Sequence, residues 1–411
     1  MTRSERGPVT RPALSRCIRV SSEEFADRYW GREPLLSAAG DLDAGFDDLF
    51  SAAAVDELIT RRGVRTPFIR MAHEGTVLAA SAYTASGGFG AEIADQVASD
   101  KVLLEFAGGA TIVLQGLHRL WPPIMEFTRA LIDDIGHPAQ VNAYVTPPSS
   151  QGFEPHYDTH DVFVLQISGA KHWRIHAPVH VDPLRTQPWD QHRAAVARAA
   201  THEPVIDAVL RPGDALYLPR GWIHSATALG ATSVHLTVGM SAYTRADVVE
   251  ALLREAGDNP ALRASLPLGI DLRDSESLEP IVEETVRALI ETLQRSDASG
   301  PGAILSSRFD ADTRAEPIAP LATLEALANL DAHTPVRWRR SLPVRIATVE
   351  DRVRIVARTK TLSLPAEAEP AVRRLATGDG ITVGELPGLD IESAVVVVRR
   401  LVREGFVVAS G

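Results

Sequence analysis

Two short stretches decide the fold and the candidate site of this chain. His156–Asp158 has the sequence HYD, and Leu218–His224, LPRGWIH, follows a Pro-Gly-Asp turn at 212–214. Residues two apart on a β-strand point to the same face, so His156 and Asp158 are predicted to project together, with Tyr157 on the opposite face. An apolar strand at 215–218 then returns the chain to the same rim and delivers His224.

Two imidazoles and one carboxylate on one face form the ligand set of a non-haem Fe(II) oxygenase, which leaves neighbouring metal positions open for a keto acid and O2. We therefore predict that His156, Asp158 and His224 bind Fe(II) and are the catalytic residues. A His-x-Asp alone is a weak signal, but the two stretches together are a strong one. The alternative is that both histidines are structural and that Asp158 caps a turn.

The other histidines of this region fit a metal site less well. His160 is followed at once by a predicted strand, so it cannot form a helical pair with His156. His172 and His176 flank Trp173 on a strand, which favours a structural role. His235, on the strand predicted at 233–238, could face the pocket, and a substrate-contacting or supporting role for it stays open.

A dicarboxylate keto acid also needs a fixed cation, because a buried carboxylate without a partner is costly. Lys171 follows a predicted turn at 168–170, on the second strand of a hairpin, and is the candidate; a surface lysine is the alternative. Asn142, Tyr144 and Thr237 lie on strands near the predicted metal and can bind the keto acid by hydrogen bonds. Each could equally be an ordinary strand residue.

The composition is that of a globular protein that works without cysteine chemistry. The chain has 411 residues, 45% hydrophobic and 23% charged, and a single cysteine, which excludes a disulfide framework or a cysteine-built metal site within one chain. There is no apolar run of about 18 residues and no apolar signal-peptide core, so we expect a cytoplasmic protein that does not enter the membrane. The formal charge of −11 argues against coating nucleic acid and favours a basic partner, such as a ribosomal protein.

The first 243 residues are predicted to form a disordered arm, residues 1–20, and a catalytic domain, residues 21–243. Within the domain, we expect a capped helix from Ser22 to Trp30 and a long helix at Leu117–Ile135. Short strands between Gln140 and Met240 indicate a barrel or sandwich. An Arg-, Ala- and His-rich insertion at 182–203 looks helical, and either lines the substrate entrance or decorates the surface.

The remainder is predicted to form two further domains. Helical periodicity at Ala246–Ala256 and Leu278–Leu293 indicates a helical domain over residues 244–335, with a possible role as a dimer surface. Strands and helices over 336–411 follow the order of a winged helix. Its second helix is mostly aliphatic at 393–398, where a DNA-reading helix would expose polar side chains, so protein docking is favoured over nucleic acid.

The stretch from Asn142 to Asp158, NAYVTPPSSQGFEPHYD, resembles the ribosomal oxygenases, and the likeness continues through 161–166, 169–174 and 212–224. These are JmjC-type, cupin-fold 2-oxoglutarate oxygenases. The resemblance implies an α+β fold: a double-stranded β-helix barrel with flanking helices, a helical dimerisation domain and a C-terminal winged helix. It places the metal ligands on His156, Asp158 and His224, the 2-oxoglutarate lysine on Lys171, and pocket-lining residues on Asn142 and Tyr144.

The resemblance implies hydroxylation of an amino-acid side chain in a protein, with Fe(II), 2-oxoglutarate and O2, and a homodimer. The expected target is the β-carbon of an arginine or histidine of a ribosomal protein. One alternative is a hydroxylase of a peptide or small-molecule natural product. Another is a regulator without catalysis, whose cupin pocket senses a ligand. The insertion at 182–203 is not matched by the resemblance, so the substrate is the least determined part.

Overall fold

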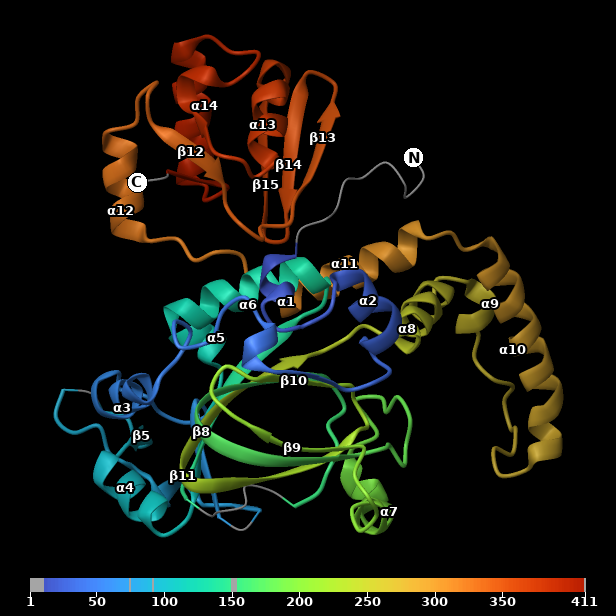
Figure 1. The fold of residues 1–411 in the computed structure, drawn as a ribbon. Helices are drawn as coiled ribbons and strands as arrows, with labels where there is room; N and C mark the ends of the chain where they lie inside the picture. The colour runs from blue at the N-terminus through green and yellow to red at the C-terminus, as the bar shows by residue number, and fades with distance from the viewer. Residues whose placement is uncertain (1–10, 74, 91, 149–153, 410–411) are drawn as a thin grey trace. The chain divides into compact units, whose positions relative to one another are not determined.

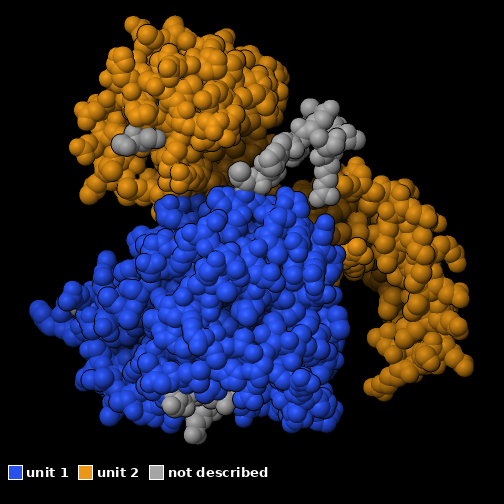
Figure 2. Space-filling view, viewed as in Figure 1, with its two compact units in different colours: residues 1–242 blue, residues 243–411 orange. Residues whose placement is uncertain are grey.

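The computed structural model describes residues 11–73, 75–90, 92–148 and 154–409 (Figure 1). The chain divides into two compact units, Met1–Ala242 and Tyr243–Gly411 (Figure 2). Residues 149–153 of the stretch 142–158, which carries the resemblance, lie outside the described part. Within the described part, no helix combines the length and the apolar character needed to cross a bilayer.

The first unit is built on a nine-stranded antiparallel sheet with the order β1-β10-β8-β11-β7-β6-β2-β3, and β9 pairs with β8. Alternating side chains of the central strands build its core, in which Val141, Ala143, Leu165 and Leu236 are fully buried. The strands are β1 Leu35–Ser37, β2 Ile69–His73, β3 Thr76–Val77, β6 Thr111–Leu114, β7 Ala139–Thr146, β8 Asp161–His176, β9 Ile206–Leu210, β10 Ala215–Leu218 and β11 Ile223–Met240, and a separate pair is β4 Thr84–Ala85 with β5 Gln96–Val97.

The two longest strands, β8 and β11, pair along most of their length and join the two halves of the sheet. The predicted turn at Ser168–Ala170 is wrong, because these residues continue β8. The irregularity falls on the partner strand, where the register shifts between Leu229 and Val234. Gly169 has φ +64, and a Cβ there would lie 2.2 Å from the Thr232 carbonyl oxygen, so glycine lets β8 pass this point without turning.

Helices flank this sheet, as Figure 1 shows. The helix predicted at 117–135 is two helices, because Trp121, directly before Pro122, adopts an extended backbone. The predicted helix after Ser21 exists, but its second half, Phe25–Tyr29, is a π-helix. The helices of this unit are α1 Pro12–Ser15, α2 Ser22–Glu24, α3 Ala52–Arg61, α4 Ser99–Ala107, α5 Leu117–Leu120, α6 Pro122–Ile135 and α7 Arg193–Ala199.

Residues 11–20 are not a disordered arm, and the prediction for them is wrong; residues 1–10 lie outside the described part. Helix α1 buries Ala13 and Leu14, and the backbone N–H groups of both donate to Asp134 Oδ2, at 2.8 and 2.9 Å. Cys17 is 1% exposed, and burial raises the pKa of its thiol to about 12. Sequence reasoning missed this helix because its apolar pattern is short and lies among basic residues.

The second unit begins with helices at the predicted positions. Helix α10 has no buried residue, and Val282, Val286 and Ile290, four residues apart, are 47–55% exposed on it. The helices are α8 Arg245–Ala256, α9 Pro260–Arg263, α10 Ser275–Arg295, α11 Ser299–Asp312 and α12 Pro320–Ala328.

The last part of the chain contains two three-stranded sheets, β16-β12-β17 and β13-β14-β15, around two amphipathic helices. Both strands and helices are present over 336–411, as expected. The elements are β12 Pro335–Trp338, β13 Arg345–Val349, β14 Arg352–Ala357, β15 Lys360–Pro365, α13 Glu369–Ala376, β16 Ile381–Thr382, α14 Ile391–Arg403 and β17 Val407–Ala409.

Candidate metal centre and cavity

The structure brings His156, Asp158 and His224 together. His156 and His224 form an isolated antiparallel bridge, with N–H···O distances of 3.2 and 2.8 Å in the two directions. One ligand atom from each of the three residues lies within 4.8 Å of the others, and His224 Nε2 is 3.8 Å from Asp158 Oδ2. Gly221, with φ +86, donates its N–H to the Asp158 carbonyl at 3.0 Å, which ties the two stretches together at the turn.

Both imidazoles are oriented by their own backbone. His156 Nδ1 lies 2.7 Å from the Glu154 carbonyl oxygen, and His224 Nδ1 lies 3.0 Å from the Trp222 carbonyl oxygen. A carbonyl can only accept, so each Nδ1 carries the proton and each Nε2 keeps its lone pair. This is how metal-binding histidines are held in the correct tautomer.

The charges of the three residues also suit a divalent cation. Burial and the neighbouring His156 lower the pKa of His224 to about 4, so its imidazole is neutral at neutral pH. Burial alone would raise the pKa of Asp158, but His160, His224, His156 and Arg70 together outweigh it and lower that pKa. A neutral imidazole and an ionised carboxylate are the forms that bind metal.

The three side chains line a cavity of about 250 Å³. Its wall combines aromatic, aliphatic and charged side chains from β2, β7, β8, β10 and β11 and from the insertion. The other lining residues are Arg70, Tyr144, Val162, Val164, Lys171, Trp173, Trp189, Leu218, Ser225, Ala226, His235 and Thr237.

Lys171 lies inside this cavity and is 3% exposed, so it is not a surface lysine. Its Nζ donates to Thr146 Oγ1 at 3.1 Å and lies 5.9 Å from the centre of the Trp173 ring. Burial lowers the pKa of the amine to about 7. A bound carboxylate would supply the counter-charge that the amine lacks in the described structure.

Three further residues, Tyr144, Trp173 and His235, line the same cavity as Lys171. The rings of Tyr144 and His235 stack with centroids 5.2 Å apart, and the Trp173 ring meets His235 edge-on at 5.5 Å. Burial, and then Lys171, lowers the pKa of His235, so it is neutral. Its Nδ1 and the Trp173 Nε1 are buried without a hydrogen-bond partner in the described structure. Both atoms are thus available to a polar ligand.

The sequence predictions for the cavity were incomplete. Tyr144 and Thr237 line it as expected, but Asn142 does not, because its Oδ1 accepts the N–H of Gly116 at 3.0 Å. Sequence reasoning missed Arg70, whose guanidinium contacts the Tyr144 phenol and partly offsets the burial that raises the pKa of this phenol. Arg70 lies on β2, 86 residues before His156, and no local motif marks it.

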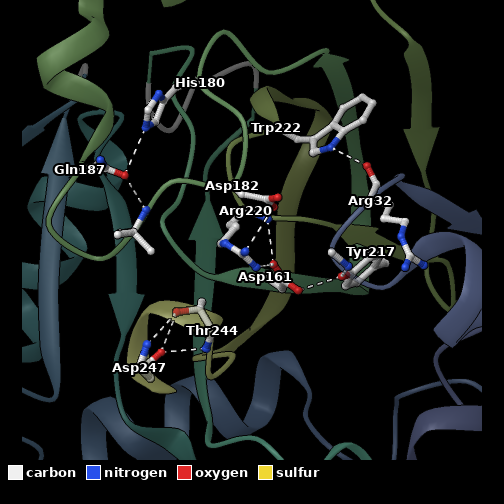
Figure 3. A network of polar contacts seen from close by, with 12 residues as sticks. Arg32, Asp161, His180, Asp182, Gln187, Tyr217, Arg220, Trp222, Thr244 and Asp247 are labelled. Atoms are coloured by element: carbon white, nitrogen blue, oxygen red, sulfur yellow. Dashed lines mark hydrogen bonds and ion pairs between the residues drawn. The ribbon is translucent and has the colours of Figure 1, made fainter. Parts of the chain in front are cut away.

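A buried polar network fixes the strand that leads to His224 (Figure 3). Asp161, fully buried, accepts from the Arg220 N–H and the Tyr217 hydroxyl, both at 2.9 Å. Arg220 also pairs with Asp182 of the insertion at 3.2 Å. Burial raises the pKa of Asp161 despite these contacts. The network therefore joins β8, β10 and the insertion behind the triad.

Comparisons with known proteins agree with this geometry. The sequence profile of the JmjC domain matches residues 119–248. Ribosomal oxygenase 1 of Gallus gallus is 36% identical over 58% of this chain and 38% of that protein, and the Rattus norvegicus protein is 30% identical over 81% and 56%. The chain contains a JmjC domain and is homologous to ribosomal oxygenase 1. It spans about half or less of the length of these two curated relatives.

A likeness of fold to one solved structure extends along 95% of the chain, well beyond the JmjC domain. The ribosomal oxygenase YcfD of Escherichia coli superposes over 95% of this chain and 98% of its own, with a TM-score of 0.52 and 18% identity, so the likeness is one of fold. Other structures of that protein contain cobalt with succinic acid or with 2-oxoglutarate. The chain is thus a mixed α+β protein with a large antiparallel sheet and a JmjC cupin domain.

Proposed function

We propose that this chain is a 2-oxoglutarate- and Fe(II)-dependent oxygenase that hydroxylates an amino-acid side chain of a protein. The observation that carries the proposal is the convergence of His156, Asp158 and His224 in a cavity that also contains the buried Lys171. Fe(II) bound by the triad would supply the activation of O2, coupled to oxidation of 2-oxoglutarate to succinate and CO2. The complex of the E. coli relative with cobalt and 2-oxoglutarate supports the same assignment.

The remaining polar groups have roles in binding the cosubstrate. Lys171 pairs with the carboxylate remote from the metal, where a charge-assisted hydrogen bond replaces the present one to Thr146. Tyr144 and Thr237, which line the cavity, donate hydrogen bonds to the same molecule. Trp173, whose ring centre lies 5.9 Å from Lys171 Nζ, and Val164 also line the cavity and limit the access of water.

The charge of the cavity favours histidine over arginine as the target residue. Its lining includes the guanidinium of Arg70, and among the described lining residues the only carboxylate is Asp158, which we assign to the metal, while Lys171 is assigned to the cosubstrate. A guanidinium entering this space would lose its hydration without gaining an acidic partner, which is costly. A neutral imidazole has no such cost.

We infer that the substrate is a ribosomal protein, because the relatives named above are ribosomal oxygenases and because the acidic chain attracts basic partners. The helical region 244–335 would form a homodimer through the exposed stripe of Val282, Val286 and Ile290 on α10. Residues 336–411 would be a protein-docking winged helix. The molar mass in solution tests the dimer, and a cytoplasmic location remains a prediction.

The test is mass spectrometry of ribosomal proteins after incubation with the Fe(II)-loaded chain, 2-oxoglutarate and O2. We expect succinate and one protein heavier by about 16 Da, the mass of one oxygen atom, and neither with His156→Ala. Absence of succinate from the wild-type reaction would refute the oxygenase. If succinate forms and only extracted metabolites are hydroxylated, the result would instead favour a hydroxylase of a small-molecule natural product.

A further inference from the structure

The insertion at 182–203 packs against residues that neighbour the triad in sequence. Its Val196, on α7, is 1% exposed and forms a small apolar cluster with Tyr157 and Ile223. Tyr157 lies between two of the triad residues in sequence, and Ile223 directly precedes the third. The insertion therefore packs against both stretches that carry the candidate ligands.

Polar contacts hold the same segment in place. The Tyr157 hydroxyl donates to the Gln187 carbonyl oxygen at 3.1 Å. The Gln187 side-chain oxygen accepts the Leu184 N–H at 2.9 Å and lies 3.2 Å from His180 Nε2 (Figure 3). The His180 ring in turn stacks on His192, with centroids 4.6 Å apart. The insertion is thus a fixed part of the site and not a surface decoration.

This attachment places one indole in the cavity wall. Trp189 is half-buried and lines the cavity, and its ring centroid is 6.1 Å from that of His156. The Arg193 guanidinium lies 4.5 Å from the indole centroid, and its Nη1 is 3.7 Å from Glu154 Oε2. The exposed ion pair adds little free energy, but together with the cation–π contact it restricts the ring.

We propose that Trp189 is a specificity-determining residue: the target side chain of the protein substrate packs against its indole while the reacting carbon lies beside the triad. The inference rests on the function proposed above and identifies the wall that positions the substrate. Hydroxylation of an unactivated carbon requires the target to be immobilised, and a braced aromatic surface does this at small entropic cost. Arg193, already on the indole, disfavours a second cation there, so a flat neutral side chain such as imidazole fits best.

The test uses peptides cut from the cell's ribosomal proteins as the probe. Trp189→Ala is compared with the conservative Trp189→Phe, and with Arg198→Ala as a matched control at an exposed position of α7. Circular dichroism and the melting temperature establish that each variant is folded. For each, we measure the peptide KM, kcat and the ratio of succinate to hydroxylated peptide.

We expect Trp189→Ala to raise the peptide KM about tenfold and to raise the ratio of succinate to product, because 2-oxoglutarate is then consumed without a seated target. Trp189→Phe should restore most of the coupling, and Arg198→Ala should match the wild type. A folded Trp189→Ala with wild-type KM and ratio would overturn the inference. So would a wild-type protein that forms succinate but hydroxylates no peptide, whereas a wild-type protein that forms no succinate refutes the proposed function itself.

Discussion

Two cavities of nearly equal size lie against the same pair of strands, and only the first contains the candidate metal ligands. The catalytic cavity measures about 250 Å³ and the second about 240 Å³. Tyr144 and His235, paired across β7 and β11, line the first, while the adjacent pair, Val145 and Val234, lines the second. Successive residues of a strand point to opposite faces of the sheet. Neighbouring residue pairs of β7 and β11 therefore place ionisable side chains in the first cavity and apolar side chains in the second.

The difference shows that volume does not define the site. Two lining residues of the catalytic cavity, His235 and Trp173, have buried polar atoms without a partner in the described structure. None of the partnerless buried polar atoms found in the described residues belongs to a residue lining the second cavity. Unpaired buried polarity is costly and a polar ligand would relieve it, so this difference favours the first cavity as the one that binds a polar ligand.

The largest effect is expected from removing a carboxylate from the catalytic cavity. Asp158→Ala should reduce succinate formation by at least about a hundredfold, because the loss of a metal ligand exceeds the 10–100-fold effect of losing an outer-shell partner. The matched control is Asp56→Ala, which removes a carboxylate from the lining of the second cavity and should leave the turnover unchanged. Equal losses of succinate formation in the two variants would show that the two cavities do not differ in their importance for turnover.

Removal of the buried lysine should have the next largest effect. Lys171→Ala should weaken 2-oxoglutarate binding by roughly 2–3 kcal/mol, the value of a charge-assisted hydrogen bond. The measurement is the Kd for 2-oxoglutarate by calorimetry with the metal-loaded protein. Lys101→Ala, on α4 beside the second cavity, provides the control. An unaltered Kd for Lys171→Ala would show that another group anchors the cosubstrate.

The affinity for 2-oxoglutarate should fall as the pH rises above 7. Burial lowers the pKa of Lys171 to about 7, so the empty cavity favours the neutral amine above that pH, whereas a bound carboxylate favours the ammonium. Binding must then take up a proton, and the Kd should rise by up to about tenfold per pH unit above pH 7. Calorimetry in buffers of different ionisation enthalpy measures the uptake. A flat profile from pH 7 to 9 would contradict a depressed pKa.

The smallest effect is expected from filling the second cavity. Ala52→Leu adds apolar volume at its lining and should change the free energy of unfolding by no more than about 1 kcal/mol, with no change in 2-oxoglutarate Kd. Denaturant unfolding and calorimetry on the same sample measure both. A clear change in Kd would mean that the two faces of the β7–β11 ladder are coupled.

The sequence predicted the parts of the site that are local. The short His-x-Asp spacing and the Pro-x-Gly-x-x-His segment are local, so His156, Asp158 and His224 were found together. The strand predicted for 156–158 is wrong, because His156 forms only an isolated bridge with His224 and β8 begins at Asp161. Arg70 could not be found in this way, because it reaches the cavity from β2 through the pairing order of the sheet. Asn142 lies opposite Thr237 in the β7–β11 pairing, but its Oδ1 accepts the N–H of Gly116, because periodicity gives the face of a strand and not the partner of a side chain. Its role toward the cosubstrate stays a prediction.

The same limits apply to the fold. Helices with strong periodicity, such as α8 and α10, were predicted at nearly the correct bounds. The continuous strand β8 was divided in two, because Ser168–Ala170 has the composition of a turn and only the partner strand shows where the irregularity lies. The role of Trp189 depends on how the insertion packs on Tyr157, a long-range contact that no motif encodes.

The single thiol of the chain has a practical consequence. Cys17 is inaccessible and strongly disfavours the thiolate, so maleimide reagents should leave the native protein unlabelled. A cysteine introduced at an exposed position of the insertion, such as Arg198, would then be the sole reactive handle. Spin labels or fluorophores attached there would report on movements of the insertion when candidate substrates are added, and no native cysteine would have to be removed first.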